Sequence, residues 1–60
     1  MNDLKYTTVE GTEMCINPFN IGVWFAAQGG TAIEVNGTVR IFKVDPKKAE
    51  QQIRDALRPE

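Results

Sequence analysis

The 60-residue sequence has no histidine and only one cysteine, Cys15. Without histidine the chain has no imidazole to serve as a general base, a metal ligand or a switch near neutral pH. A single cysteine rules out an intramolecular disulfide bond and any zinc site built on several cysteines. We therefore expect no metal ion and no cofactor.

Long apolar runs are also absent. The longest, Val23 to Ala27, is five residues, whereas a membrane-spanning helix needs about 20. Residues 1–5 (MNDLK) lack the apolar core of a signal peptide. The sequence therefore predicts a cytoplasmic protein that does not insert into a membrane.

Neither sign of charge dominates, because the sequence contains seven basic and eight acidic residues and its formal net charge is −1. This balance is unlike that of a strongly basic nucleic-acid-binding protein or of a polyanion mimic. No linker or repeat interrupts the chain, so residues 1–60 should form one domain. A domain of this size buries only about 60% of its unfolded surface. With no disulfide or metal to stabilise it, we expect a homo-oligomer.

Apolar and polar residues alternate in short segments separated by turn-forming residues, and a helical pattern follows at the C-terminus. The predicted strands span residues 4–9, 13–17, 21–27, 31–35 and 39–44, and the predicted helix spans residues 46–57. This combination predicts an α+β domain, in which one helix packs on a face or edge of a small, bent antiparallel sheet.

Both ends of the helix are marked in the sequence. Asp45 can cap its first turn, Pro46 suits the first helical position, and Pro59 prevents its continuation. The apolar residues of the helix recur at helical spacing and should form the stripe that docks on the sheet. These residues are Ala49, Ile53, Ala56 and Leu57.

The third predicted strand has two alternative arrangements. If side chains alternate strictly between the two faces of the strand, Trp24 lies on one face. The opposite face then carries Ile21, Val23, Phe25 and Ala27. A bulge at Gly22 would reverse this arrangement. The sequence leaves both alternatives open.

Asn36-Gly37 is the strongest hairpin signal in the chain. A two-residue loop would place Ile33 opposite Arg40, whereas a three-residue loop ending at Gly37 would place Ile33 opposite Val39. We prefer the second register because it pairs apolar residues with each other.

Reactive groups are few. Cys15 is the only strong nucleophile, and no histidine is available to activate it. Glu10 and Glu13 flank a predicted turn, where solvated carboxylates are common, and Gly29-Gly30 lacks the lysine of a phosphate-binding loop. The sequence predicts no catalytic residues and no enzyme activity.

Three aromatic side chains are candidates for contact with a protein partner: Phe19, Trp24 and Phe42. Trp24 is either a core residue or an exposed anchor at an interface. If Ile41 faces the core, Phe42 should lie outside it, which makes Phe42 the better interface candidate.

Basic residues are concentrated in the last 23 residues of the chain. Arg40, Lys43, Lys47 and Lys48 lie around the predicted fifth strand and the start of the helix, where they could contact phosphate groups. This patch supports an alternative function as a small nucleic-acid-binding regulator.

Two family patterns resemble this sequence. The segments INPFNI (16–21) and GTAI (30–33), the Asn36-Gly37 hairpin and the C-terminal amphipathic helix resemble the small flagellar FlbD/SwrD-like proteins. That resemblance implies a role in supporting motility without catalysis, and so no catalytic residues. A phage-encoded origin fits the same pattern.

Five strands and a helix within about sixty residues also resemble the CsrA-type RNA-binding regulators, which are strand-swapped dimers. Those proteins rely on basic residues in the first strand and before the helix. The corresponding segments here are LKY (4–6) and VDP (44–46), so the resemblance implies the topology more than RNA binding. Taken together, the sequence predicts a non-enzymatic, self-associating adaptor that presents a sheet face or edge to a protein partner.

Overall fold

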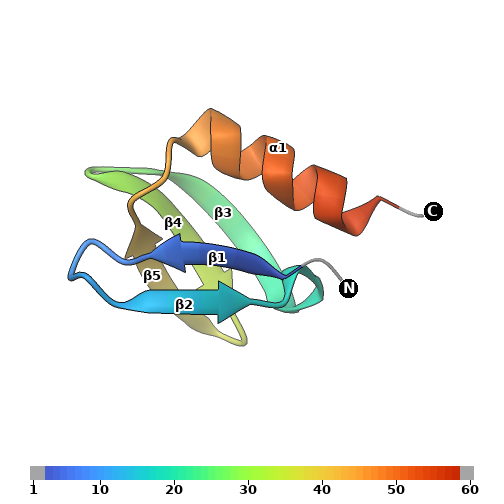
Figure 1. Ribbon diagram of the computed structural model, residues 1–60, viewed down its shortest axis with the longest axis horizontal. Coiled ribbons are helices and arrows are strands. Elements are labelled where there is room, and N and C mark those ends of the chain that lie inside the picture. The colour runs from blue at the N-terminus through green and yellow to red at the C-terminus, as the bar shows by residue number, and fades with distance from the viewer. Residues whose placement is uncertain (1–2, 59–60) are drawn as a thin grey trace.

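A computed structural model describes residues 3–58 of the chain. It contains five antiparallel strands and one C-terminal helix, which confirms the predicted α+β class (Figure 1). The elements in chain order are β1 (Leu4–Thr7), β2 (Glu13–Ile16), the short 3-10 helix η1 (Pro18–Asn20), β3 (Ile21–Ala27), β4 (Gly30–Val35), β5 (Thr38–Phe42) and α1 (Pro46–Leu57).

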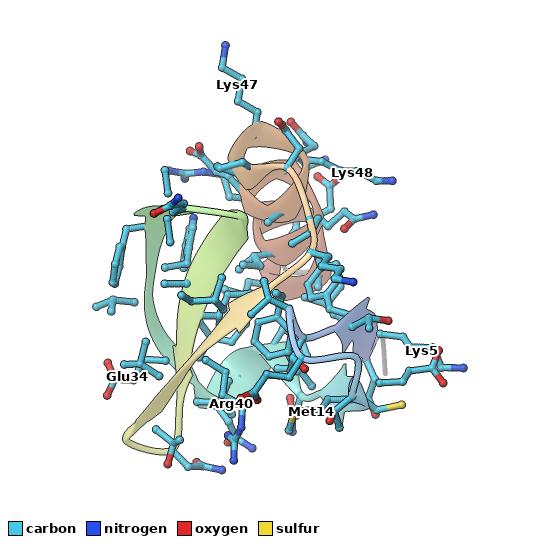
Figure 2. All side chains as sticks on the ribbon, turned by 90° about the vertical axis from the view of Figure 1, so that its left-hand side faces the viewer. Lys5, Met14, Glu34, Arg40, Lys47 and Lys48 are labelled. Atoms are coloured by element: carbon cyan, nitrogen blue, oxygen red, sulfur yellow. The ribbon has the colours of Figure 1, made fainter. Side chains whose placement is uncertain are left out.

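The strands form two sheets rather than one continuous bent sheet. One is the β1–β2 hairpin, and the other has the order β3-β4-β5. They are joined at one corner, where Thr8 bridges Phe42 and the Lys43 N–H donates to the Thr7 carbonyl at 2.7 Å. The hairpin and α1 lie on the same side of the three-stranded sheet (Figures 1 and 2). We call that side of the sheet its inner face and the opposite side its outer face.

Two strands end two residues earlier than the sequence predicts, and β2 ends one residue earlier, at Ile16. The first stops at Thr7 instead of residue 9, because the Thr8 N–H turns to the Thr12 carbonyl at 2.8 Å and begins the hairpin loop. The fifth stops at Phe42 instead of residue 44, because the Val44 N–H folds back onto the Phe42 carbonyl at 2.9 Å. That bend turns the chain toward the helix.

The register between β4 and β5 is the two-residue alternative. Val35 pairs with Thr38 and Ile33 pairs with Arg40, so the preferred three-residue loop with Ile33 opposite Val39 is wrong. The physical reason is the backbone of the turn. Asn36 has a φ of 52° and Gly37 a φ of 87°, and positive φ at both central residues is what the favoured two-residue hairpin turn requires.

Strand β3 contains the bulge that the sequence left open. Ile21 pairs with Val35 and Trp24 pairs with Ile33, so Gly22 and Val23 together oppose a single residue of β4. An extra residue shifts the alternation of side chains along the strand. Ile21 and Trp24 therefore share the inner face, and the strictly alternating arrangement is wrong.

The core lies between the inner face, the hairpin and the helix. Five side chains form its buried cluster: Tyr6, Ile16, Ile33, Phe42 and Ile53. Phe42 is only 1% exposed, so the expectation that it lies outside the core is wrong. A one-residue change of register moves every side chain of a strand to the other face, and the two-residue turn therefore exchanges the places expected for Ile41 and Phe42.

The helix begins and ends as the sequence predicts. The Asp45 carboxylate accepts hydrogen bonds from the Lys47 and Lys48 backbone N–H groups at 3.1 and 3.3 Å, which satisfies two donors that a helix start leaves unpaired. Ala49 and Ile53 are buried, and the helix contacts η1, β3 and β4.

Replacing Ile53 by alanine tests this docking. Ile53 is completely buried, so Ile53→Ala should lower the free energy of unfolding by about 2–5 kcal/mol. Urea denaturation followed by circular dichroism measures the loss. Leu57→Ala, on the same helix but 37% exposed, is the matched control and should cost clearly less. A loss below about 0.5 kcal/mol for Ile53→Ala, no larger than an ordinary surface change, would show that the helix does not dock through this residue.

Candidate protein-interaction surface

The outer face of the three-stranded sheet is largely apolar, and no helix or strand within residues 3–58 lies over it. Strand register places its central row across three strands, where Phe25 pairs with Ala32 and Ala32 pairs with Ile41. Val23 and Val39 lie one step along the strands on the same face, beside Glu34. In Figure 2, Glu34 projects from the outer side of the sheet, away from the helix and the hairpin.

Large apolar side chains on this face are half exposed. The exposed fraction is 49% for Val23, 53% for Phe25 and 54% for Val39. Val9 joins them, because it lines a depression of about 250 Å³ together with Val39 and Ile41. Contiguous apolar patches on small proteins are commonly sites of contact with other molecules. The outer face has this character over all three strands.

Glu34 is the only charged residue within β3 and β4. Its carboxylate lies over Gly22 in the bulge: a Cβ atom added to Gly22 would lie 2.9 Å from Glu34 Oε1. A side chain at position 22 would therefore push the carboxylate aside. The bulge both turns Val23 outward and leaves room for this single charge.

The three predicted aromatic contacts are not brought together. Phe19 is 67% exposed on η1, where its N–H donates to the Asn17 side-chain oxygen at 3.0 Å. Trp24 is half buried and packs against the core cluster from the inner face. Phe42 is inside the core and unavailable to a partner. Of the three, only Phe19 offers a largely exposed ring.

Sequence reasoning missed Val23, Phe25 and Val39 as surface residues. The signal that could have identified them is the Asn36-Gly37 dipeptide, because the two-residue turn that it favours places Val39 on the outer face. For Val23 and Phe25 the signal is Gly22, since glycine within a strand often marks a bulge.

The four predicted phosphate-contacting residues are all exposed but do not form one patch. Figure 2 shows Arg40 at the opposite end of the molecule from Lys47 and Lys48, which extend from the start of the helix. Lys43 lies between them in the chain, just after β5. The structure therefore distributes these cations over separate surfaces.

A second depression, of about 420 Å³, lies between β2, η1 and the β4–β5 hairpin. Its floor includes Ile16, Ile33 and Phe42, and Arg40 is the only basic residue on its wall. Cys15, an exposed free thiol, also lines it. Within residues 3–58 no group of three or more histidine, cysteine, aspartate or glutamate side chains could hold a metal ion.

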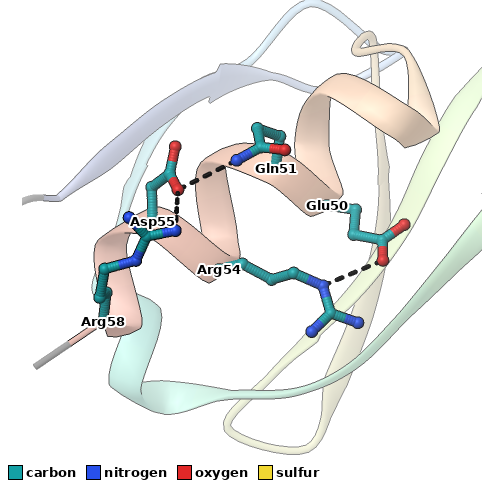
Figure 3. A network of polar contacts seen from close by, with 5 residues as sticks. All are labelled: Glu50, Gln51, Arg54, Asp55 and Arg58. Carbon is teal, nitrogen blue, oxygen red and sulfur yellow. Dashed lines mark hydrogen bonds and ion pairs between the residues drawn. The ribbon is translucent and has the colours of Figure 1, made fainter.

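Figure 3 shows that the exposed side of the helix is polar. Arg54 donates to Glu50 at 3.0 Å, Gln51 donates to Asp55 at 3.0 Å, and Arg58 lies 3.4 Å from the same aspartate. Exposed pairs of this kind contribute little to stability, at most about 1 kcal/mol each. This network covers the helix with solvated charge, in contrast with the apolar outer face of the sheet.

Tyr6 links the hairpin to the helix. Its hydroxyl donates to Gln52 Oε1, and its ring centroid lies 6.1 Å from that of Phe42. Burial raises the pKa of the Tyr6 phenol above its ordinary value, because the protein interior disfavours the charged phenolate. This side chain is a structural tether in the core.

Comparison of the chain with protein families, curated proteins and solved structures finds no match. None of the helices in residues 3–58 has the length and apolar character required to span a bilayer.

The raised pKa of Tyr6 predicts a loss of stability at alkaline pH. The unfolded phenol ionises near pH 10, at about its model-peptide value, whereas the folded phenol holds its proton to higher pH. The contribution of Tyr6 to stability is therefore complete below the unfolded pKa and is lost as the pH rises through the folded pKa. Urea unfolding should show that the free energy of unfolding of the wild type falls relative to that of Tyr6→Phe as the pH is raised from about 8 to about 11.

The two chains differ only at position 6, so the difference between their free energies of unfolding reports Tyr6. Because the sequence contains one tyrosine, ultraviolet absorbance of the phenolate gives its pKa directly. Equal titration midpoints in the native and urea-unfolded chain would contradict the prediction.

Proposed function

We propose that this chain is a non-enzymatic interaction module that binds protein through the outer face of its three-stranded sheet. The observation that supports this role most directly is the group of half-exposed apolar side chains on that face, Val23, Phe25 and Val39. Burying aromatic and aliphatic side chains of this kind against a second apolar surface is the main favourable contribution to association between proteins.

The charge distribution favours a protein partner over a nucleic acid. The outer face carries the carboxylate of Glu34 among its apolar residues, which would repel a phosphate backbone. Three of the four candidate phosphate-contacting cations lie elsewhere, Lys47 and Lys48 at the start of the helix and Arg40 at the opposite end of the molecule; only Lys43 borders this face. The resemblance to the FlbD/SwrD-like proteins, whose named members are expected to act without catalysis, supports the same role.

Site-directed photo-crosslinking tests this proposal. A photoreactive phenylalanine analogue at Phe25 should give discrete protein adducts in a lysate of the producing cell, because that ring lies within the proposed contact. The matched control places the same analogue at Lys5, which Figure 2 shows on the far side of the hairpin. Adding Val39→Asp to the Phe25 probe should remove the adducts, since it places a charge on the same face.

Equal labelling from both positions, or adducts that persist with Val39→Asp, would contradict binding through the outer face. Far-ultraviolet circular dichroism of each variant separates a lost contact from a lost fold.

A further inference from the structure

We propose that the outer face binds a second copy of this chain, with the two three-stranded sheets packed face to face about a two-fold axis that crosses the strands. This inference rests on the proposed function, because it assigns an occupant to the same surface. It is carried by the arrangement of charged and apolar residues in rows across the sheet.

The strand register defines three rows on the outer face. The central row is Phe25, Ala32 and Ile41. Toward the β4–β5 turn, the next row contains Val23, Glu34 and Val39. In the other direction lie Ala27 and Gly30, which pair with each other and line a shallow depression together with Lys43 and Asp45. The Asp45 carboxylate is already hydrogen-bonded to the first turn of the helix. The face therefore has the carboxylate of Glu34 at one end, apolar residues in the middle and the ammonium group of Lys43 at the other end.

Charge selects the direction of the two-fold axis. If the axis ran along β4, rotation would place the Glu34 carboxylates of the two copies against each other, which is unfavourable. An axis across the strands instead carries each Glu34 to the opposite end of the other sheet, beside the depression that Gly30 and Lys43 line. The lysine stem can then cover apolar surface while its ammonium group reaches the carboxylate.

The same axis brings like residues of the central row together. Phe25 of one copy faces Phe25 of the second copy, and Ile41 likewise meets its own counterpart, whereas Ala32 between them is only 2% exposed. The half-exposed Val23 meets the small Ala27. A self-complementary patch of this kind is what an isologous two-fold interface requires, and face-to-face sheets pack about 10 Å apart with interdigitated side chains.

Within residues 3–58, the side chains of Glu34 and Lys43 have no ion-pair or hydrogen-bond partner. The ion pairs between residues 3–58 are Lys5–Glu13, Glu50–Arg54 and Asp55–Arg58, and neither Glu34 nor Lys43 donates or accepts a side-chain hydrogen bond there. Both charges are thus available for an intermolecular pair.

The size of the face sets the strength of the dimer. Three strands of about six residues span roughly 20 by 14 Å, a flat area of about 280 Å² per copy. The two copies together contribute about 560 Å² of flat area, which is below the roughly 1,200 Å² of standard specific interfaces. We therefore expect a weak dimer, with a dissociation constant on the order of 10–100 µM.

Sedimentation of the full chain with reciprocal charge changes tests this arrangement. In the Glu34→Lys variant both charged residues at the proposed contact are basic, and in the Lys43→Glu variant both are acidic. The dissociation constant of each variant alone should therefore be about tenfold higher than that of the wild type. An equimolar mixture of the two variants restores opposite charges across the interface and should form a heterodimer of near wild-type affinity. Lys47→Glu makes the same charge change at the start of the helix and should leave the dimer unchanged.

Phe25→Asp should remove the dimer altogether, with circular dichroism showing that the variant is folded. A wild-type chain that stays monomeric up to about 1 mM, well above the expected dissociation constant, would overturn the inference. So would a dimer whose affinity is the same in both charge variants. In either case, adducts from the Phe25 crosslinker with a different protein would leave the proposed function intact, which keeps the two tests separate.

Discussion

The backbone of the Asn36-Gly37 turn determines which residues this protein buries and which it exposes. Positive φ angles at both positions close the β4–β5 hairpin in two residues. That register places Phe42 and Ile33 on the inner face and leaves Val39 and Ile41 outside. Because a shift of one residue would exchange the two faces of β5, the core and the candidate surface both depend on this turn.

Within residues 3–58, one face of the three-stranded sheet is left without a covering element. One helix and one hairpin are available to cover three strands, and both lie on the inner face (Figure 1). They bury Tyr6, Ile16 and Ile53 together with the inner residues of the sheet. No further element within residues 3–58 covers the opposite side, where Val23 and Phe25 are half exposed. We propose that a second protein surface covers them.

The sequence predicted elements well and side-chain faces poorly, for identifiable reasons. The helix start at Asp45 and the five strands depend on local signals, namely a capping carboxylate, proline, and apolar alternation. The pairing of Ile33 depends on a competition instead. Apolar cross-strand pairs differ by about 0.2–1 kcal/mol, which was too little to override the turn geometry favoured by Asn36-Gly37. The bulge at Gly22 is defined by the pairing between β3 and β4, in which two residues of β3 oppose one residue of β4. The alternation of residues along β3 alone does not reveal that pairing. Among candidate site residues, Phe42 was therefore misplaced, and Val23, Phe25 and Val39 were overlooked.

The most direct test of this account is the solvent accessibility of individual side chains, measured by nuclear magnetic resonance with a soluble paramagnetic probe in dilute solution. The account predicts strong relaxation of the Phe25 ring and the Val39 methyl groups, and protection of the Phe42 ring. Protection of Val39 together with strong relaxation of Phe42 would show that β5 has the opposite register, and would contradict both the described core and the outer face as an interaction surface.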